Sequence, residues 1–151
     1  MPPAAGTWER EMAEAPKVVG DVMTQDVFTL EHNEKLSVAD DVMRLGRIRH
    51  IPVVDDDGAV VGVVSQRDLF FNALLRALGY GSYASQKTLE EYRVKDAMHE
   101  PVITCRPNTP LSEAARTMLE KKIGCLPVVE DGQLVGIVTE SDFVALIARG
   151  G

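Results

Sequence analysis

The stretch VVGVVSQRDLF at residues 60–70 returns at residues 134–144 as LVGIVTESDFV. Each copy places a glycine and two apolar residues before a Ser or Thr, and an Asp follows that hydroxyl residue three positions later. The valine-rich part is typical of a buried strand, and the hydroxyl and acid are typical of the first turn of a helix. Two such copies predict a chain built from two similar units.

Two further blocks repeat in the same order. DVMTQDVFTL at 21–30 corresponds to DAMHEPVITC at 96–105, and LSVADDVMRLGRIRHIPVVDDDG at 36–58 corresponds to LSEAARTMLEKKIGCLPVVEDG at 111–132. Asp96 lies 75 residues after Asp21, whereas Thr139 lies 74 residues after Ser65, because the turn in the first unit is one residue longer. A repeat that occurs only twice predicts a pseudo-symmetric pair of units packed on each other, rather than a solenoid.

The local patterns agree between the two units. Apolar residues at helical spacing predict helices over 35–47 and 110–122, and valine-rich runs around Asp/Gly turns predict hairpins over 51–65 and 126–139. A second helix is expected after each hairpin, at 66–78 and 140–149. Each unit is therefore a short strand, helix, strand, strand and helix, which is an α/β (α+β) fold. The expected divisions are a flexible lead-in at 1–16, a first unit at 17–78, a connecting loop at 79–91 and a second unit at 92–149.

The composition excludes several classes of partner. The 151 residues carry a formal net charge of −7, with 45% hydrophobic and 26% charged residues. A protein with a net negative charge is repelled by the phosphates of nucleic acid and by an anionic membrane surface. No apolar run has the length of a membrane helix, and the N-terminus lacks the features of a signal peptide. We therefore expect a cytoplasmic protein with no nucleic acid or membrane partner.

The sequence offers little material for catalysis or metal binding. Cys105 and Cys125 show no CxxC spacing, so reduced thiols are the favoured interpretation and a regulatory disulfide the lesser one. The histidines at 32, 50 and 99 are far apart and form no metal-binding motif. No nucleophile motif or phosphate-binding loop is present. We expect no metal, no required cofactor and no enzymatic activity. Four methionines at matching repeat positions are expected in the core: Met23, Met43, Met98 and Met118.

The repeated Ser65-x-x-Asp68 and Thr139-x-x-Asp142 have two interpretations. The structural one is a helix N-cap, with the hydroxyl and the acid satisfying backbone N–H groups. The functional one is a ligand site, because a helix N-terminus favours phosphate and a carboxylate there can accept both hydroxyls of a ribose. The glycine of each copy would let a flat group approach the backbone. Capping alone leaves the rest of the repeat unexplained.

The pattern G-hydrophobic-hydrophobic-[ST]-x-x-D, preceded by [IL]-P-V-V-[DE] and a D-G turn, resembles the CBS motif, named after cystathionine β-synthase. Two motifs in tandem resemble a CBS pair, or Bateman module, over residues 18–148. The resemblance implies tandem β-α-β-β-α motifs packed as a pseudo-twofold pair, with two clefts that bind an adenosine-containing ligand such as AMP, ADP, ATP or S-adenosylmethionine. It also implies a regulatory module that forms a homodimer and signals to a protein partner by conformational change. The alternative is a structural, dimerising module without a ligand.

The resemblance carries over residue by residue to a first cleft, which is the favoured one: Val63, Ser65, Asp68, Thr109, Ala114, Ile123 and Gly124. Asp68 would hold the ribose hydroxyls, and Ser65 and Thr109 would reach ribose or phosphate oxygens. Val63 and Ile123 would enclose the adenine.

A second cleft would take its residues from the same positions of the opposite units: Glu34, Ala39, Ile48, Arg49, His50, Ile137, Thr139 and Asp142. It departs from the family pattern at Glu34, where an acid would repel phosphate, although Arg49 and His50 could offset that charge. This cleft would prefer a different ligand or stay empty. Arg47, Arg49 and His50 are either a solvated loop that balances the nearby acids or a phosphate clamp, and Arg67 could serve the same purpose.

Overall fold

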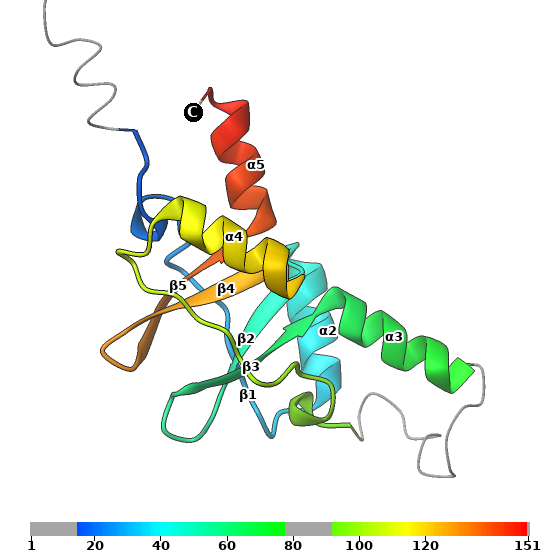
Figure 1. Cartoon of the computed structure of the whole chain (residues 1–151). Helices are drawn as coiled ribbons and strands as arrows, with labels where there is room; N and C mark the ends of the chain where they lie inside the picture. Colours follow the sequence, from blue (N-terminus) through cyan, green and yellow to red (C-terminus); the bar gives the residue numbers. More distant parts are fainter. Residues whose placement is uncertain (1–14, 78–91, 151) are drawn as a thin grey trace, which may run out of the picture.

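The computed structural model describes residues 15–77 and 92–150 (Figure 1). Nearly all of the expected lead-in at 1–16 and the whole expected loop at 79–91 lie outside these ranges. The elements follow in the order η1 (Val19–Asp21), β1 (Leu30–Glu31), α2 (Leu36–Gly46), β2 (His50–Val54), β3 (Val60–Ser65), α3 (Gln66–Ala77), η3 (Val94–Asp96), α4 (Leu111–Lys121), β4 (Cys125–Glu130), β5 (Gln133–Thr139) and α5 (Glu140–Ala148). This is the predicted tandem order of strands and helices, except for the opening strand of the second unit.

Two small sheets carry the two units. In the first, β1 pairs parallel to β2 and β2 pairs antiparallel to β3; in the second, β4 pairs antiparallel to β5. The opening strand expected in the second unit is reduced to a single parallel bridge between Cys105 and Val128. The strand centres are fully buried, as their unbroken valine runs predict: Ile51, Val53 and Val64 in one unit and Leu126, Val128 and Val138 in the other.

The first helix of each unit buries one narrow stripe. In α2 the stripe is Leu36, Ala39 and Met43, and α4 repeats it with Leu111, Ala114 and Met118. Spacings of three and four residues place these side chains on one helical face, which packs on the sheet. Both helices end at a residue in the left-handed conformation, Arg47 and Lys122, whose N–H donates to the carbonyl of the methionine.

The opening segments of the two units are exchanged. Val19, from the start of the first unit, is fully buried in the core of the second, and Val94 is fully buried in the core of the first. Figure 1 shows the N-terminal segment, in blue, beside α4. Two backbone hydrogen bonds join Thr24 to Ile137 of β5 at 2.9 and 3.0 Å, and the His99 N–H donates to the Val63 carbonyl of β3 at 2.8 Å. This exchange ties the two units together.

Candidate functional site

The N-terminus of α3 is capped as the structural interpretation predicts. The N–H and the hydroxyl of Ser65 donate to Asp68 Oδ2 at 2.7 and 2.8 Å, and the Asp68 N–H donates back to Ser65 Oγ at 3.2 Å. This is a reciprocal capping box. The acid at this position therefore stabilises the helix whether or not a ligand is bound.

The same turn in the second unit is similar but more open. The Thr139 N–H donates to Asp142 Oδ2 at 2.8 Å, whereas the Thr139 hydroxyl lies 3.4 Å from that oxygen and 2.8 Å from Ser141 Oγ. Within residues 15–77 and 92–150, the hydrogen bonds of Asp142 all fall on Oδ2. Its second oxygen keeps its acceptor capacity.

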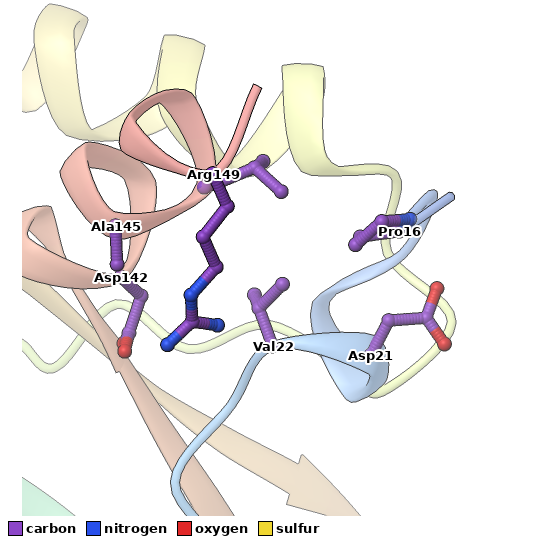
Figure 2. Close-up of a pocket in the computed structure, with 7 residues that line it drawn as sticks. Pro16, Asp21, Val22, Asp142, Ala145 and Arg149 are labelled. Carbon is purple, nitrogen blue, oxygen red and sulfur yellow. The ribbon is translucent and has the colours of Figure 1, made fainter. Parts of the chain in front are cut away.

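Asp142 also lines a pocket of about 330 Å³ between η1 and α5. Figure 2 shows the Arg149 side chain extending between Asp142 and Val22, with Asp21 and Pro16 on the opposite wall. Asp21 is held by the N–H groups of Lys17 and Val18, whose hydrogen bonds lower the pKa of its carboxyl. The full lining is Pro16, Asp21, Val22, Asp142, Ala145, Leu146 and Arg149.

The lining combines apolar, acidic and basic side chains. Its apolar residues offer a surface for a flat base, its two carboxylates can accept hydroxyl hydrogens, and its guanidinium suits a phosphate or carboxylate. Of the polar residues in this lining, the repeated motif predicted Asp142 but not Asp21 or Arg149. Asp21 and Arg149 lie outside the repeated motif, and only the exchange of opening segments brings Asp21 to the pocket that Asp142 lines.

In the first unit, a histidine covers the corresponding acid. His99 Nε2 lies 2.5 Å from Asp68 Oδ1, and the Asp68 side chain is only 11% exposed. His99 lies outside the repeated motif and was not among the predicted site residues. Its position in the repeat corresponds to Thr24, which pairs with Ile137 of β5.

Residues from the two predicted clefts meet at the seam between the units. A Cβ built on Gly124 would stand 3.0 Å from His50 Nε2. Burial lowers the pKa of His50, and the nearby carboxylates of Glu140 and Asp68 act in the opposite direction. The carbonyl of Gly124 accepts the Glu140 N–H at 3.1 Å, so this part of the seam is continuous with the first turn of α5.

Two pairs of predicted site residues lie away from the seam between the units. Ala39 and Ala114 are 0% and 1% exposed in separate cores, which leaves no side-chain surface for a ligand. Thr109 accepts the Arg106 N–H through its hydroxyl, and its carbonyl accepts the Val19 N–H. Glu34 is exposed, and its carbonyl accepts the Val94 N–H from η3. Thr109 and Glu34 thus hold the exchanged opening segments.

The remaining predicted site residues flank the seam. Val63 and Ile137 pair with His99 and Thr24, and Ile48 and Ile123 pack as partly buried side chains on the two cores. The side chains of Arg47, Arg49 and Arg67 are exposed to solvent.

The motif glycines contact protein rather than open space. Cβ atoms built on Gly62 and Gly136 would stand 2.8 Å from Met98 Sδ and 2.6 Å from Met23 Sδ. A methionine therefore fills the space beside each glycine, where the functional interpretation places a flat group. Met43 and Met118 lie in the cores, as expected, and Met23 and Met98 pack against the core of the opposite unit.

One group of side chains among the described residues could hold a metal ion: Glu31, His32 and Asp56, whose donor atoms lie within 4.8 Å of one another. His32 Nε2 lies 3.2 Å from Glu31 Oε1 and 3.8 Å from Asp56 Oδ1. Glu31 and His32 are half-buried and Asp56 is exposed, so the imidazole of His32 stands between two carboxylates near the surface. The sequence did not predict this proximity.

Residues 19–74 and 94–149 each match the CBS domain family. The chain belongs to the CBS domain family.

A CBS domain-containing protein of Dictyostelium discoideum is 30% identical over 133 residues, which cover 87% of this chain and 92% of that protein. The fold is that of CBS-domain pair structures: CBSX2 in complex with AMP has a TM-score of 0.72 at 31% identity, covering 89% of this chain and 98% of its own. The CBS domain pair of MJ0100, in complex with 5'-methylthioadenosine and S-adenosyl-L-methionine, has a TM-score of 0.74 at 26% identity, covering 90% and 100%.

Several relatives are much longer than the matched region. The chain spans 42% of a Methanocaldococcus jannaschii protein that is 30% identical over 129 residues. It spans 24% of a homoserine O-acetyltransferase from Methanohalobium evestigatum, at 32% identity over 130 residues. That acetyltransferase name describes the whole relative. No helix within residues 15–77 and 92–150 has both the length and the apolar character needed to cross a membrane.

Proposed function

We propose that this CBS pair is a regulatory sensor, without catalytic activity, that binds an adenosine-containing ligand between its two units. The observation that carries the proposal is the pair of helix N-termini, each holding an Asp on its first turn, with Asp142 opening onto a pocket. A carboxylate beside a helix N-terminus can accept the ribose diol while the helix end favours the phosphate. The complexes of CBSX2 with AMP and of MJ0100 with S-adenosyl-L-methionine support this ligand class.

The test is isothermal titration with AMP, ADP, ATP and S-adenosylmethionine, together with thermal unfolding. A ligand at a hundred times its Kd stabilises the folded protein by about 2.7 kcal/mol, which raises the Tm by several degrees. The informative variant is Asp142→Asn, because the amide oxygen can still accept the Thr139 N–H while the charge is removed. It is expected to weaken binding by about tenfold, the loss typical of one charge-assisted hydrogen bond.

The matched control is Asp96→Asn. Asp96 holds η3 through the Arg93 N–H at 2.8 Å, and its counterpart in the other opening segment is the pocket residue Asp21. This control is expected to change binding by less than about twofold, whereas Asp21→Asn should weaken it. Failure of all four ligands to bind at millimolar concentration would remove the sensor proposal and leave the ligand-free structural module.

The second part of the proposal is a homodimer formed through α3 and α5. Both helices present large apolar side chains to solvent: Phe70 and Phe71 are 68% and 57% exposed, and Val144 and Ile147 are 67% and 76% exposed. Phe70 and Val144 occupy corresponding positions in the repeat, so the two faces are related by the pseudo-twofold. Such related faces suit an isologous contact with a second copy.

The oligomeric state is measured by light scattering after size exclusion. Phe70→Lys with Ile147→Lys is expected to give a monomer, because two ammonium groups cannot be buried in an apolar contact. Leu45→Lys is the control, since Leu45 is 87% exposed at the end of α2. A monomeric parent protein would overturn this part of the proposal. Transmission of ligand binding to a protein partner would then depend on one CBS pair alone.

A further inference from the structure

We infer that His99 makes the two helix N-terminal sites unequal, so that an adenosyl ligand binds first at Asp142 and only second at Asp68. This inference rests on the proposed function, because it states which site takes the ligand. The pseudo-symmetry of the repeat would otherwise predict two equivalent sites, and the family pattern at Glu34 favoured the Asp68 site.

The Asp68 carboxylate is already engaged at both oxygens. Oδ2 accepts the N–H and the hydroxyl of Ser65, and Oδ1 faces His99 Nε2 at 2.5 Å. The side chain of Asp68 is 11% exposed, so little of the carboxylate remains for a new partner. A ribose diol can reach Oδ1 only when the imidazole leaves it.

The backbone places His99 at this position. The His99 N–H donates to the Val63 carbonyl at 2.8 Å, and its own carbonyl lies against Gly62. The imidazole itself is 73% exposed, so it can rotate away into solvent. Because the imidazole is largely exposed to solvent, its contact with Asp68 shifts the binding equilibrium by no more than about fivefold, so His99 weakens the Asp68 site without abolishing it.

The second unit has the same backbone arrangement without the imidazole. Thr24 exchanges hydrogen bonds with Ile137 at 2.9 and 3.0 Å, as the counterpart of His99 and Val63. Thr24 has no imidazole that could cover the second carboxylate oxygen of Asp142. In the described part of the chain, Asp142 keeps one oxygen outside its capping hydrogen bonds and lines a pocket. The second carboxylate oxygen of Asp142 can therefore accept a hydrogen bond from a ribose diol without displacing another side chain.

The test is isothermal titration of the full chain with AMP, using substitutions that exchange the two repeat residues. His99→Thr is expected to tighten the weaker site by about two- to fivefold, and Thr24→His to weaken the tighter site by a similar factor. Asp142→Asn should weaken the tighter site by about tenfold, and Asp68→Asn should leave the affinity of that site within about twofold of the parent value. Thermal unfolding of each variant without ligand shows that it remains folded.

The outcomes separate the two proposals. Loss of the tighter site in Asp68→Asn, or weaker AMP binding in His99→Thr, would overturn the role of His99 and leave the sensor intact. Equal affinities of the two sites for AMP in the parent protein would also overturn the role of His99 and leave the sensor intact. If none of AMP, ADP, ATP and S-adenosylmethionine binds to the parent protein or to His99→Thr, the proposed function itself is overturned, and the inference falls with it.

Discussion

Met23 rests on Gly136: its sulfur lies 2.6 Å from the point where a Cβ on that glycine would stand, and the Thr24 carbonyl lies 2.9 Å away. The second copy of the contact joins Met98 to Gly62 at 2.8 Å. Met23 and Met98 belong to the exchanged opening segments. The glycine of each motif therefore makes room for the segment that joins one unit to the other.

Gly136→Ala is expected to destabilise the protein by about 1–3 kcal/mol, because a methyl group there overpacks a close contact. The sulfur of Met23 can move, but the Thr24 carbonyl is held by its hydrogen bond from Ile137. The measurement is the free energy of unfolding from urea denaturation. Gly62→Ala should behave alike, since the His99 carbonyl stands 2.9 Å from its Cβ position.

The control for both substitutions is Gly46→Ala. Its added Cβ would meet Phe28 and Ile48 at 3.5 and 3.6 Å, which are ordinary contacts, and the residue ends α2. Alanine there should be neutral or stabilising by up to about 1 kcal/mol. An unchanged stability in Gly136→Ala would show that the opening segment can withdraw without cost.

The sequence predicted most of the helices and strands, but it did not predict which segments pack on which unit. Hydrophobic spacing predicted α2 and α4 because a local period decides which helix face is buried, and Ser65 with Asp68 predicted a cap because capping is local. The core in which Val19 is buried cannot be predicted from a local pattern. The two units have similar sequences, so the sequence does not show on which of the two cores the opening segment packs. The pocket at Asp142 and the His99 contact follow from that exchange, so neither could be predicted.

Ser65→Ala tests the cap directly. The substitution removes the hydroxyl that accepts the Asp68 N–H at 3.2 Å and donates to its carboxylate. Loss of an N-cap side chain costs about 1 kcal/mol, which urea denaturation resolves. Ser112→Ala is the control, because Ser112 is exposed within the first turn of α4. A similar loss in the control would mean that the hydroxyl does not act as a cap.

The two cysteines are expected to be unreactive in the folded protein. Burial, with a smaller contribution from Glu113, raises the pKa of Cys105 to about 11. Burial, with a smaller contribution from Glu140, raises the pKa of Cys125 to about 12. Because the thiolate is the reactive form, labelling by a thiol reagent at pH 7 should be slow until urea unfolds the chain. Rapid labelling of the native protein would favour the regulatory disulfide.

His50 is expected to make the protein less stable in mild acid. Burial lowers the pKa of its imidazole in the folded state, so between that value and the ordinary pKa of about 6.5 the unfolded chain binds more protons. The free energy of unfolding therefore rises with pH through this window, and stability is lost as pH falls from about 6.5 toward the lowered pKa.

His50→Gln removes this contribution while keeping a polar side chain at the seam. Urea denaturation at pH 7.5 and at several lower pH values should show a smaller loss of stability in the variant than in the parent protein. Glu140→Gln should act in the opposite direction, because the Glu140 carboxylate favours the imidazolium and its loss lowers the pKa of His50 further. Parallel stability profiles for the parent protein and His50→Gln would show that His50 is not protonated differently in the folded and unfolded states.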